Sequence, residues 1–386
     1  MNRNFDVVIV GCGFSGAASA RALAEKGKHV LILEKRNHIA GNMFDFIDNN
    51  GVMVHKYGPH IFHTSNKAVF EFLGRFSEFF PYEHRVIGKI DGQFVPIPFN
   101  FKSADILFGK EKSEKIKNAL KEAFDGRERV TVNELLKGAG EIKAVGEYVF
   151  EKVFLHYTAK QWGMPTEKVD KSVLNRVPVV FGYDDRYFSD TCQYMPKDGY
   201  TKLFENMLDH ENITIKLNTD AGSMIHADAE KGIVEIEGEV FENPVIWTAP
   251  ADELFGYKYG RLPYRSLDLK FEQHEKTWYQ PAAVVNYPNE EEFTRITEFK
   301  YLTGQKIDGA TTIMKEYPLP YDQNAKKGNI PYYPVVGPEN QAVYNCYLSL
   351  AQKVGSLYLC GRLAQYRYYN MDAAVAEALI LADRIQ

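Results

Sequence analysis

The stretch FDVVIVGCGFSGAASARALAEKGKHVLILEK, from Phe5 to Lys35, decides the fold because it has the order strand, glycine turn, helix and strand. Its turn carries the pattern G-x-G-x-x-G at Gly11, Gly13 and Gly16. Such glycines permit a tight turn, close approach of the backbone to a pyrophosphate and close packing of the helix on the strand. Glu34 ends the second strand 23 residues after Gly11, where a carboxylate can accept hydrogen bonds from ribose hydroxyls. The stretch therefore predicts a dinucleotide-binding unit, with the phosphates at the N-terminus of the helix.

The residues that follow Glu34 distinguish between two dinucleotides. The segment KRNHIAGN, residues 35–42, places an Arg soon after the acid and a Gly-Asn pair a few residues later. This order resembles the extended fingerprint of FAD-binding proteins, in which the chain runs along the cofactor, whereas NAD enzymes usually proceed directly to another helix. We therefore expect FAD rather than NAD.

The composition is typical of a globular enzyme. With 386 residues and 45% apolar side chains, the chain can build a large core and more than one domain. A net charge of −5 gives no positive electrostatic field that would attract nucleic acid. No apolar run approaches the ~20 residues that cross a bilayer. The N-terminus enters a strand at once, without room for a signal peptide. The four cysteines are scattered, which argues against a disulfide framework or a zinc ribbon and favours a cytoplasmic location.

Strand and helix patterns divide the chain into three parts. Apolar residues at three- and four-residue spacing predict helices from Lys102 to about Val153, whereas residues 85–98 and 267–285 are rich in strand-forming residues with Pro and Gly between them. We expect an α/β fold, in which a Rossmann-like FAD-binding domain is interrupted by a helical-bundle insert and an antiparallel β-sheet insert. The expected domains are a discontinuous FAD-binding domain (1–78, 196–250 and 350–386), a helical substrate and dimerisation domain (100–165), and a β-sheet substrate domain (79–99, 166–195 and 251–349).

Two aromatic segments are candidates for ligand contacts. HKYGPHIFHT carries His55, His60 and His63, but no Cys or carboxylate cluster accompanies them, so a metal site is disfavoured. A place beside the flavin or substrate and a purely structural role remain as alternatives for these histidines. YTAKQWGMP, which begins at Tyr157, combines ring surfaces with hydrogen-bonding tips, as expected for holding a nucleobase. A core role for its Trp162 is the alternative.

Three arginines lie in settings that suit a phosphate ligand. Arg176 stands near the start of a polar stretch that could form a mobile loop, and Arg265 and Arg295 lie in partly apolar, strand-like sequence. Arginine is favoured for phosphate because its planar guanidinium binds two oxygens and stays charged when desolvated. Each arginine alone could form a surface ion pair, but as a set with many tyrosines they suggest a diphosphate clamp.

The motifs GPHIFHT, YTAKQWG, DDRYFSD, GYTKLFENML, PAAVVNYP, PYYPV and GRLAQYRYYNMD occur in the order found in prokaryotic UDP-galactopyranose mutases. The chain resembles this family from the first strand to the last helix. The resemblance implies an isomerase that converts UDP-galactopyranose into UDP-galactofuranose without net redox change, because N5 of reduced FAD attacks the anomeric carbon and displaces the diphosphate. NAD(P)H or another reductant is then needed only for activation. The resemblance also implies a homodimer and a product used in cell-surface polysaccharides.

The resemblance further implies roles for individual residues. The implied catalytic residues are Arg176 and Arg295, which stabilise the diphosphate leaving group, and His63 beside the flavin. The implied substrate-binding residues are Tyr157, Thr158, Trp162, Tyr187, Arg265, Tyr333, Tyr368, Asn370, His84 and His60. The cofactor-binding residues expected from the glycine motif and the resemblance together are Gly11, Gly13, Phe14, Ser15, Gly16, Glu34, Lys35, Asn42, His60, Gly361, Arg362 and Met371.

Three positions depart from the family pattern. Asn370 stands in YYNMD where the family usually has Asp, His84 stands in PYEHRV in place of Asn, and Tyr194 stands in QYMP in place of Gly. We expect these positions near the sugar, where the loss of a carboxylate changes which hydroxyls can be recognised. dTDP-fucopyranose and UDP-N-acetylgalactosamine are therefore alternative substrates for the same chemistry. The alternative from a different enzyme class is an amine-oxidase-like flavin oxidoreductase.

Overall fold

The first strand, helix and strand form as the glycine pattern predicts. The computed structural model describes residues 4–168 and 178–385. Strand β1 (Val7–Val10) leads through the glycine turn into helix α1 (Phe14–Glu25), and the chain returns as β2 (Val30–Leu33), parallel to β1. Every residue of both strands is buried, as expected for a parallel sheet that is covered on both faces.

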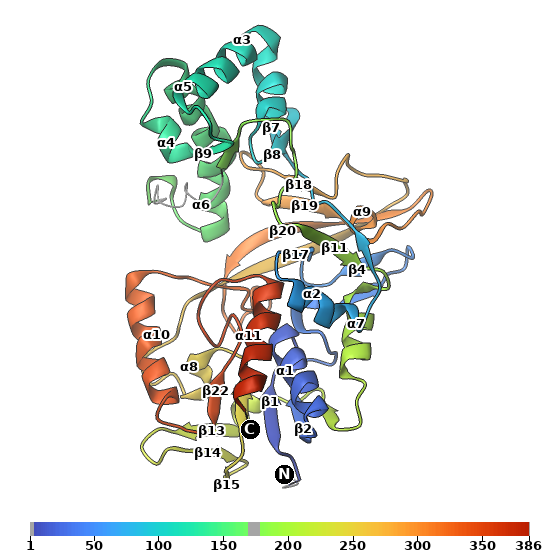
Figure 1. Cartoon of the computed structure of the whole chain (residues 1–386), viewed down its shortest axis with the longest axis vertical. Coiled ribbons are helices and arrows are strands. Elements are labelled where there is room, and N and C mark those ends of the chain that lie inside the picture. Colours follow the sequence, from blue (N-terminus) through green and yellow to red (C-terminus); the bar gives the residue numbers. More distant parts are fainter. Residues whose placement is uncertain (1–3, 169–177, 386) are drawn as a thin grey trace.

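A five-stranded parallel sheet collects strands from distant parts of the chain. Its order is β12-β2-β1-β16-β22, with β12 at Ile213–Lys216, β16 at Val245–Trp247 and β22 at Leu357–Leu359. Helix α11 (Met371–Arg384) packs on α1, and both helices carry buried alanines. The Rossmann-like fold is therefore confirmed, and Figure 1 shows this sheet and its helices in the lower half of the molecule.

Residues 101–162 form the helices at the top of Figure 1. They are α3 (Phe101–Ala123), α4 (Val132–Leu136) and α5 (Gly140–Val149), and α5 continues directly into the π-helical segment η2 (Phe150–Leu155) and then into α6 (His156–Trp162). The side chains of Asn100 and Thr131 cap α3 and α4 by accepting hydrogen bonds from backbone N–H groups of the first turn. Helix α3 is broken at Gly109, whose φ of 71° is not helical.

A seven-stranded sheet lies between these helices and the parallel sheet (Figure 1). In sheet order its strands are β21 (Tyr333–Pro334), β17 (Tyr264–His274), β20 (Thr311–Pro320), β19 (Arg295–Glu298), β18 (Val284–Asn286), β7 (Val86–Ile90) and β8 (Gln93–Ile97). All neighbours are antiparallel except β18 and β7, which run parallel. The prediction of a purely antiparallel sheet is wrong at this pair, because the β7–β8 hairpin comes from a distant part of the chain and joins β18 without a connecting turn.

Shorter elements complete the fold. The remaining strands are β3 (Asp45–Ile47), β4 (Met53–His55), β5 (Phe62–Thr64), β6 (Phe79–Pro81), β9 (Arg129–Thr131), β10 (Pro178–Val180), β11 (Cys192–Pro196), β13 (Ile225–Asp228), β14 (Ile233–Ile236) and β15 (Glu239–Phe241). The remaining α-helices are α2 (Lys67–Gly74), α7 (Gly199–Leu208), α8 (Ala251–Leu254), α9 (Phe299–Thr303) and α10 (Pro338–Ala351). In residues 4–168 and 178–385, no helix has the length and apolarity needed to cross a membrane.

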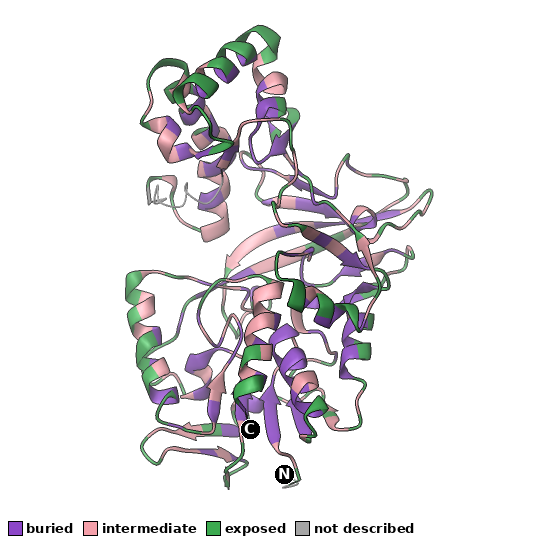
Figure 2. Ribbon diagram, viewed as in Figure 1, coloured by how far each residue is buried: buried purple, intermediate pink, exposed green. Residues whose placement is uncertain are grey.

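One large core supports the elements that carry the expected site residues. Buried residues of β1, of the helices at the top of the molecule and of the seven-stranded sheet, such as Ile9, Leu135 and Val284, belong to a single contiguous cluster. Figure 2 shows the buried residues in the strands and on the inward helix faces, whereas the outer faces of α3 and α10 are exposed. The two ends of the expected site are therefore held on one packed body.

Candidate active site

The glycine turn forms a narrow cradle at the carboxyl ends of β1 and β2. Gly11 has a φ of +93°, and a side chain at this position would collide with Oγ1 of Thr248. A side chain on Gly16 would collide with the carbonyl oxygen of Gly11, so helix and turn touch backbone to backbone. Gly361, with a φ of +101°, closes the cradle from the other end of the chain, where a side chain would lie 3.0 Å from Oγ of Ser15. Only glycine permits these approaches.

Polar groups around the cradle fit a dinucleotide. The Glu34 carboxylate accepts hydrogen bonds from the backbone N–H groups of Cys12 at 2.8 Å and Arg36 at 2.9 Å, which fixes its direction and leaves lone pairs for ribose hydroxyls. The Arg36 guanidinium lies 4.3 Å over the Tyr57 ring and donates to Oδ1 of Asn42 at 2.8 Å. Its other terminal nitrogen, Nη1, is buried and has no hydrogen-bond partner among the described residues. A buried cationic donor without a partner is what an anionic cofactor would satisfy.

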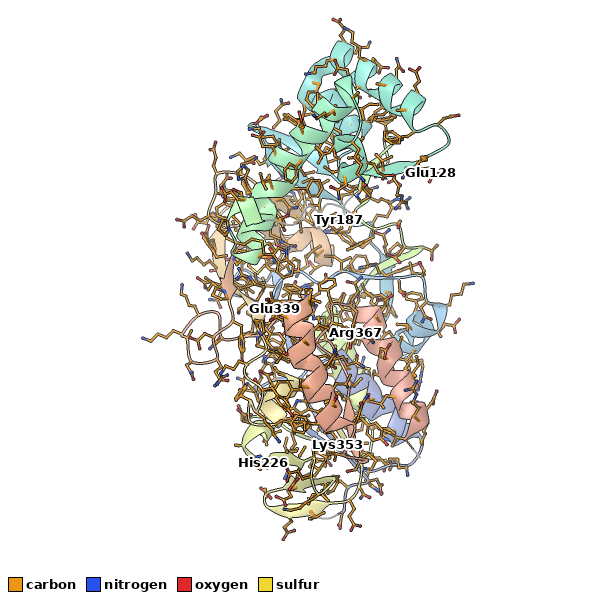
Figure 3. All side chains as sticks on the ribbon, turned by 90° about the vertical axis from the view of Figure 1, so that its left-hand side faces the viewer. Glu128, Tyr187, His226, Glu339, Lys353 and Arg367 are labelled. Atoms are coloured by element: carbon orange, nitrogen blue, oxygen red, sulfur yellow. The ribbon has the colours of Figure 1, made fainter. Side chains whose placement is uncertain are left out.

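A single cavity of about 470 Å³ runs from this cradle to the seven-stranded sheet. Its lining includes all the residues expected to bind the cofactor, from Gly11 to Met371. At the far end it includes expected substrate-binding and catalytic residues from six separate parts of the chain, namely His84, Tyr157, Tyr187, Arg295, Tyr333, Tyr368 and Asn370. Figure 3 labels Tyr187 at mid-height, between the helical end of the molecule and its lower half. The structure thus brings the two predicted sets of residues together in one space.

Arg295 is held at the edge of the cavity by a buried acid. It begins β19, and its Nε lies 3.1 Å from Oε2 of Glu316, its register partner on β20. The Glu316 side chain is 2% exposed. Burial raises the pKa of Glu316, and the charge of Arg295 acts in the opposite direction. Burial would lower the pKa of Arg295, but the Glu316 carboxylate holds it above its usual range. The guanidinium therefore stays charged, and Arg295 is one of the residues that line the cavity.

Tyrosines surround this guanidinium. Tyr157 comes from α6, and burial raises the pKa of its hydroxyl to about 12, although the Arg295 charge lowers it. The rings of Tyr333 and Tyr368 lie 5.7 Å apart, and the Arg362 guanidinium lies 5.0 Å from the Tyr333 ring. Protonated phenols donate hydrogen bonds to anionic oxygens, so this end of the cavity is built to receive negative charge.

The histidines of HKYGPHIFHT take three different positions. His63 lines the cavity, with Nδ1 2.8 Å from Oδ2 of Asp190 and its ring stacked on Phe188 at 3.7 Å. His60 also lines the cavity, and burial, followed by the charges of His55 and Arg362, lowers its pKa to about 3. His55 is buried, and its Nδ1 accepts a hydrogen bond from the backbone N–H of His60 at 3.1 Å. A structural role thus accounts for the contact of His55, whereas His60 and His63 face the ligand space. The described residues contain no group of three or more His, Cys, Asp or Glu side chains that could hold a metal ion.

The three positions that depart from the family pattern do not lie together. His84 and Asn370 line the cavity. Burial, with the charges of Arg295 and His63, lowers the pKa of His84 to about 3, so its imidazole is neutral. Tyr194 is not among the residues that line the cavity, and its ring packs 4.8 Å from that of Phe70. The expectation that Tyr194 lies near the sugar is therefore wrong, because β11 directs this side chain toward α2.

Four expected residues lie away from the cavity lining or outside the described chain. Thr158 is buried on α6, and Trp162 ends the same helix. Arg265 is buried on β17, where its Nε donates to the carbonyl oxygen of Gln161 at 3.0 Å. Arg176 lies outside the residues that the structure describes. The sequence motif around Tyr157 therefore contributes one residue to the cavity wall and others to the packing behind it.

The site residues that could not be predicted from the sequence are the structural partners of the predicted ones. Glu316 has no local signal, because its importance depends on the neighbouring strand that carries Arg295. Asp190 belongs to the motif DDRYFSD, but its contact with His63 spans 127 residues. Asn286 is a register partner of Arg295 on β18 and lines the cavity, with its buried Oδ1 unpaired within the described part of the chain. Such partners are defined by strand register rather than by sequence spacing.

Comparison with known proteins agrees with this geometry. Residues 152–368 match the UDP-galactopyranose mutase family model, and residues 9–76 match the model of an NAD(P)-binding Rossmann-like domain. The chain is 38% identical to a probable UDP-galactopyranose mutase of Klebsiella pneumoniae, over 98% of this chain and 94% of that protein. It is 35% identical to a dTDP-fucopyranose mutase of Escherichia coli, over 97% of this chain and 96% of that protein.

A solved structure shows the same fold. The crystal structure of reduced UDP-galactopyranose mutase superimposes with a TM-score of 0.70 at 17% identity, over 99% of this chain and 93% of the other. The full-length similarity, the family match and the arrangement of cradle and clamp lead to one conclusion. The chain belongs to the UDP-galactopyranose mutase family and is a flavin-dependent isomerase.

Proposed function

We propose that this enzyme interconverts the pyranose and furanose forms of a nucleotide sugar. The observation that carries the proposal is the single cavity that joins a dinucleotide cradle to a tyrosine-lined Arg295. UDP-galactopyranose is the first candidate substrate, because most of the similarity is to UDP-galactopyranose mutases. dTDP-fucopyranose is the second candidate, supported by the comparable similarity to a mutase of that sugar. UDP-N-acetylgalactosamine remains an alternative that rests on the neutral His84 and Asn370 alone.

The residues of the cradle would hold FAD. They are Gly11, Gly13, Phe14, Ser15, Gly16, Glu34, Lys35, Asn42, His60, Gly361, Arg362 and Met371, all of which line the cavity. When bound and reduced, the flavin supplies a nucleophile for the anomeric carbon, so the isomerisation has no net redox change. A reductant such as NAD(P)H is then required for activation but is not consumed by turnover.

The chain's own residues would bind the substrate and stabilise the diphosphate. Arg295, kept charged by Glu316, pairs with phosphate oxygens as negative charge develops on the leaving group. Tyr157, Tyr333 and Tyr368 donate hydrogen bonds to the same oxygens. Tyr187, 41% exposed and edge-on to His84, offers a ring to the base. Arg176, which lies outside the described residues, would be the second arginine of the clamp, while Thr158, Trp162 and Arg265 would support it from behind.

His63 would contact the flavin or the sugar through one nitrogen. Its Nδ1 is engaged by Asp190, so Nε2 is the nitrogen available to a ligand in the cavity. The other oxygen of Asp190 accepts a hydrogen bond from Oγ of Ser65 at 3.1 Å, which fixes the carboxylate. Stacking on Phe188 fixes the plane of the ring. This arrangement supports a role for His63 in catalysis.

We also propose the expected division of labour within the chain. Residues 1–78, 196–250 and 350–386 would form the FAD-binding domain, 100–165 the helical domain that also dimerises, and the rest the β-sheet substrate domain. All four cysteines are free thiols, which supports a reducing, cytoplasmic location, where the product would enter the synthesis of cell-surface polysaccharide.

One experiment tests the proposed function. Dithionite-reduced enzyme is incubated with UDP-galactopyranose, dTDP-fucopyranose or UDP-N-acetylgalactosamine, and furanose products are sought by NMR. We expect furanose from at least one donor, and none from oxidised enzyme. Absence of furanose with all three donors would contradict the proposal. Oxygen uptake with amines, without prior reduction, would instead support the amine-oxidase-like alternative.

A further inference from the structure

Helix α6 is the short element that brings Tyr157 to the cavity, and its approach is irregular. It is the last part of one continuous helical run from Gly140 to Trp162, and it follows directly on the π-helical segment η2 (Phe150–Leu155). A π-helical segment changes the direction in which the following side chains point, and such segments are frequent at functional sites. Tyr157 is the second residue after this segment. Its position therefore depends on what holds α6 in place.

Lys160, one turn after Tyr157, holds α6 to the seven-stranded sheet. Its ammonium group donates to the carbonyl oxygens of Tyr287 at 2.5 Å, Glu291 at 2.8 Å and Phe293 at 3.3 Å. An ammonium group has three donors, and all three are used. Within residues 4–168 and 178–385, no carboxylate forms an ion pair with Lys160. The contact is thus with the backbone of one loop and depends on the shape of that loop.

The loop in question connects β18 to β19 and ends at the clamp arginine. Tyr287 follows Asn286, the last residue of β18, and its N–H donates to the carbonyl oxygen of Thr294 at 2.9 Å. Arg295 is the next residue. The N–H of Thr294 in turn donates to the carbonyl oxygen of Glu316 at 2.9 Å. Lys160 therefore connects the helix that carries Tyr157 to the loop that precedes Arg295.

A second cation secures the other end of α6. Arg265 donates from Nε to the carbonyl oxygen of Gln161, and its guanidinium lies so close to Gly163 that a side chain there would come within 2.8 Å of Nη1. Gly163 ends the helix with a φ of 61°. A cation at a helix C-terminus is favourable for the unpaired carbonyl groups. Arg265 at the end of α6 and Lys160 within it thus both attach this helix to the seven-stranded sheet and its loops.

We propose that Lys160 is a positioning residue, which fixes Tyr157 opposite Arg295 by holding α6 on the β18–β19 loop and so sets the affinity for the nucleoside diphosphate. The inference rests on the proposed function, because it assumes that Tyr157 and Arg295 bind this part of the substrate. Loss of one hydrogen bond to a charged group can weaken binding by about tenfold or more. Loss of Lys160 should therefore weaken diphosphate binding without disturbing the cofactor cradle.

The test compares two lysines that contact the same loop. Lys160→Met removes the three hydrogen bonds at nearly constant volume. Lys89→Met is the control, because Lys89 reaches Glu291 at 3.6 Å from the solvent side and does not contact α6. Binding of UDP and of dTDP to the flavin-loaded enzyme is measured by titration calorimetry. A double-mutant cycle with Tyr157→Phe shows whether Lys160 acts through Tyr157.

We expect Lys160→Met to keep its flavin and to raise the Kd by about tenfold or more, whereas Lys89→Met stays near wild type. In the Tyr157→Phe background the effect should shrink. An unchanged Kd for Lys160→Met, or equal effects in both backgrounds, would overturn the inference. Failure of the wild type to bind either nucleotide would contradict the proposed function itself, and the inference with it.

A second variant covers the case in which Lys160→Met does not fold. Burial lowers the pKa of Lys160 to about 8, against the charge of Glu291. The other charged groups at this loop are its own Glu290 and Glu292, and Lys89, which lies 3.6 Å from Glu291. A neutral amine donates only two hydrogen bonds, so the wild type should bind UDP more weakly at about pH 9 than at about pH 7. Lys160→Arg stays charged and should lose this dependence. If the wild-type Kd is equal at both values, or if both proteins weaken alike, the inference is wrong.

Discussion

Replacement of Arg295 should separate two effects that the structure combines in one residue. Arg295→Met removes the cation from the cavity and also leaves Glu316, 2% exposed, as a buried carboxylate without its partner. Breaking a buried ion pair by removing one partner costs about 3–5 kcal/mol of folding stability. Loss of one charged donor to developing negative charge lowers turnover by about a hundredfold to a thousandfold. The single variant should therefore be both unstable and inactive.

The pH dependence identifies the source of the instability. Burial already raises the pKa of Glu316, and without Arg295 it rises further. A carboxyl group whose pKa is higher in the folded than in the unfolded protein binds more protons when folded, so its stability contribution falls as the pH rises above about 4.5. Arg295→Met should thus lose stability from about pH 5 to pH 8 more steeply than the wild type. Urea unfolding followed by circular dichroism measures this difference.

A double variant then isolates the catalytic part. Arg295→Met with Glu316→Gln removes both charges, and we expect it to recover most of the lost stability, because no unpaired charge remains buried. Turnover should stay as low as in Arg295→Met, since the phosphate partner is still missing. Recovery of turnover in the double variant would refute a role for Arg295 at the diphosphate. Wild-type stability of the single variant at about pH 7.5 would refute the account of Glu316.

Three further predictions concern the cradle and the far end of the cavity. Gly11→Ala should lose FAD, measured as the ratio of flavin to protein absorbance, because its side chain would collide with Thr248; Gly27→Ala, at a similar φ of +84° in open space, should keep it. The His84 imidazole is neutral in the folded protein, whereas in the unfolded protein it binds a proton below about pH 6.5. The free energy of unfolding should therefore fall by about 1.4 kcal/mol for each pH unit below about 6.5, and urea unfolding should show a slope shallower by that amount in His84→Asn. Asn370→Asp should change the relative turnover of the three donors in the NMR assay, and equal ratios in both proteins would show that Asn370 does not select the sugar.

The cradle could be predicted from the sequence because its determinants are local. Buried strand residues, glycine spacing and the acid after β2 all lie within residues 5–35 and define the βαβ unit by themselves. The helical region expected from Lys102 to about Val153 is interrupted, because residues 129–131 pair with β10 as a strand before Thr131 caps α4. Local sequence patterns thus predict the presence of a helix or strand better than the residues at which it begins and ends.

The far end of the cavity could be predicted only in part, because its contacts are long-range. Arg295 was found as an arginine in strand-like sequence, but its partner Glu316 follows from the register of β19 and β20. The parallel pairing of β18 with β7 and the π-helical segment before Tyr157 have no spacing signature. Lys160 lies within the motif YTAKQWG, but the motif does not indicate its hydrogen bonds to three loop carbonyl groups more than 120 residues away. Sequence patterns identify the chemical groups, whereas tertiary pairing determines which of them act together.

The distribution of charge along the cavity determines what effect a carboxylate at position 370 should have. The acidic residues that line the cavity are Glu34, Asp220 and Glu253. They lie at the cradle end, where burial raises the pKa of Glu253 to about 7. The far end is lined by Arg295 and, beside Tyr333, by Arg362, and among the described residues it has no lining carboxylate.

An aspartate at position 370 would therefore introduce the first carboxylate into the lining at this end of the cavity. If Asn370→Asp weakens binding of free UDP and of all donors by the same factor, the neutral amide serves diphosphate affinity. If the affinity for free UDP is unchanged but the affinities for the three donors change by different factors, the amide of Asn370 recognises the sugar. Because electrostatic repulsion is screened by salt and hydrogen-bond geometry is not, repeating the titration at high ionic strength distinguishes the two causes.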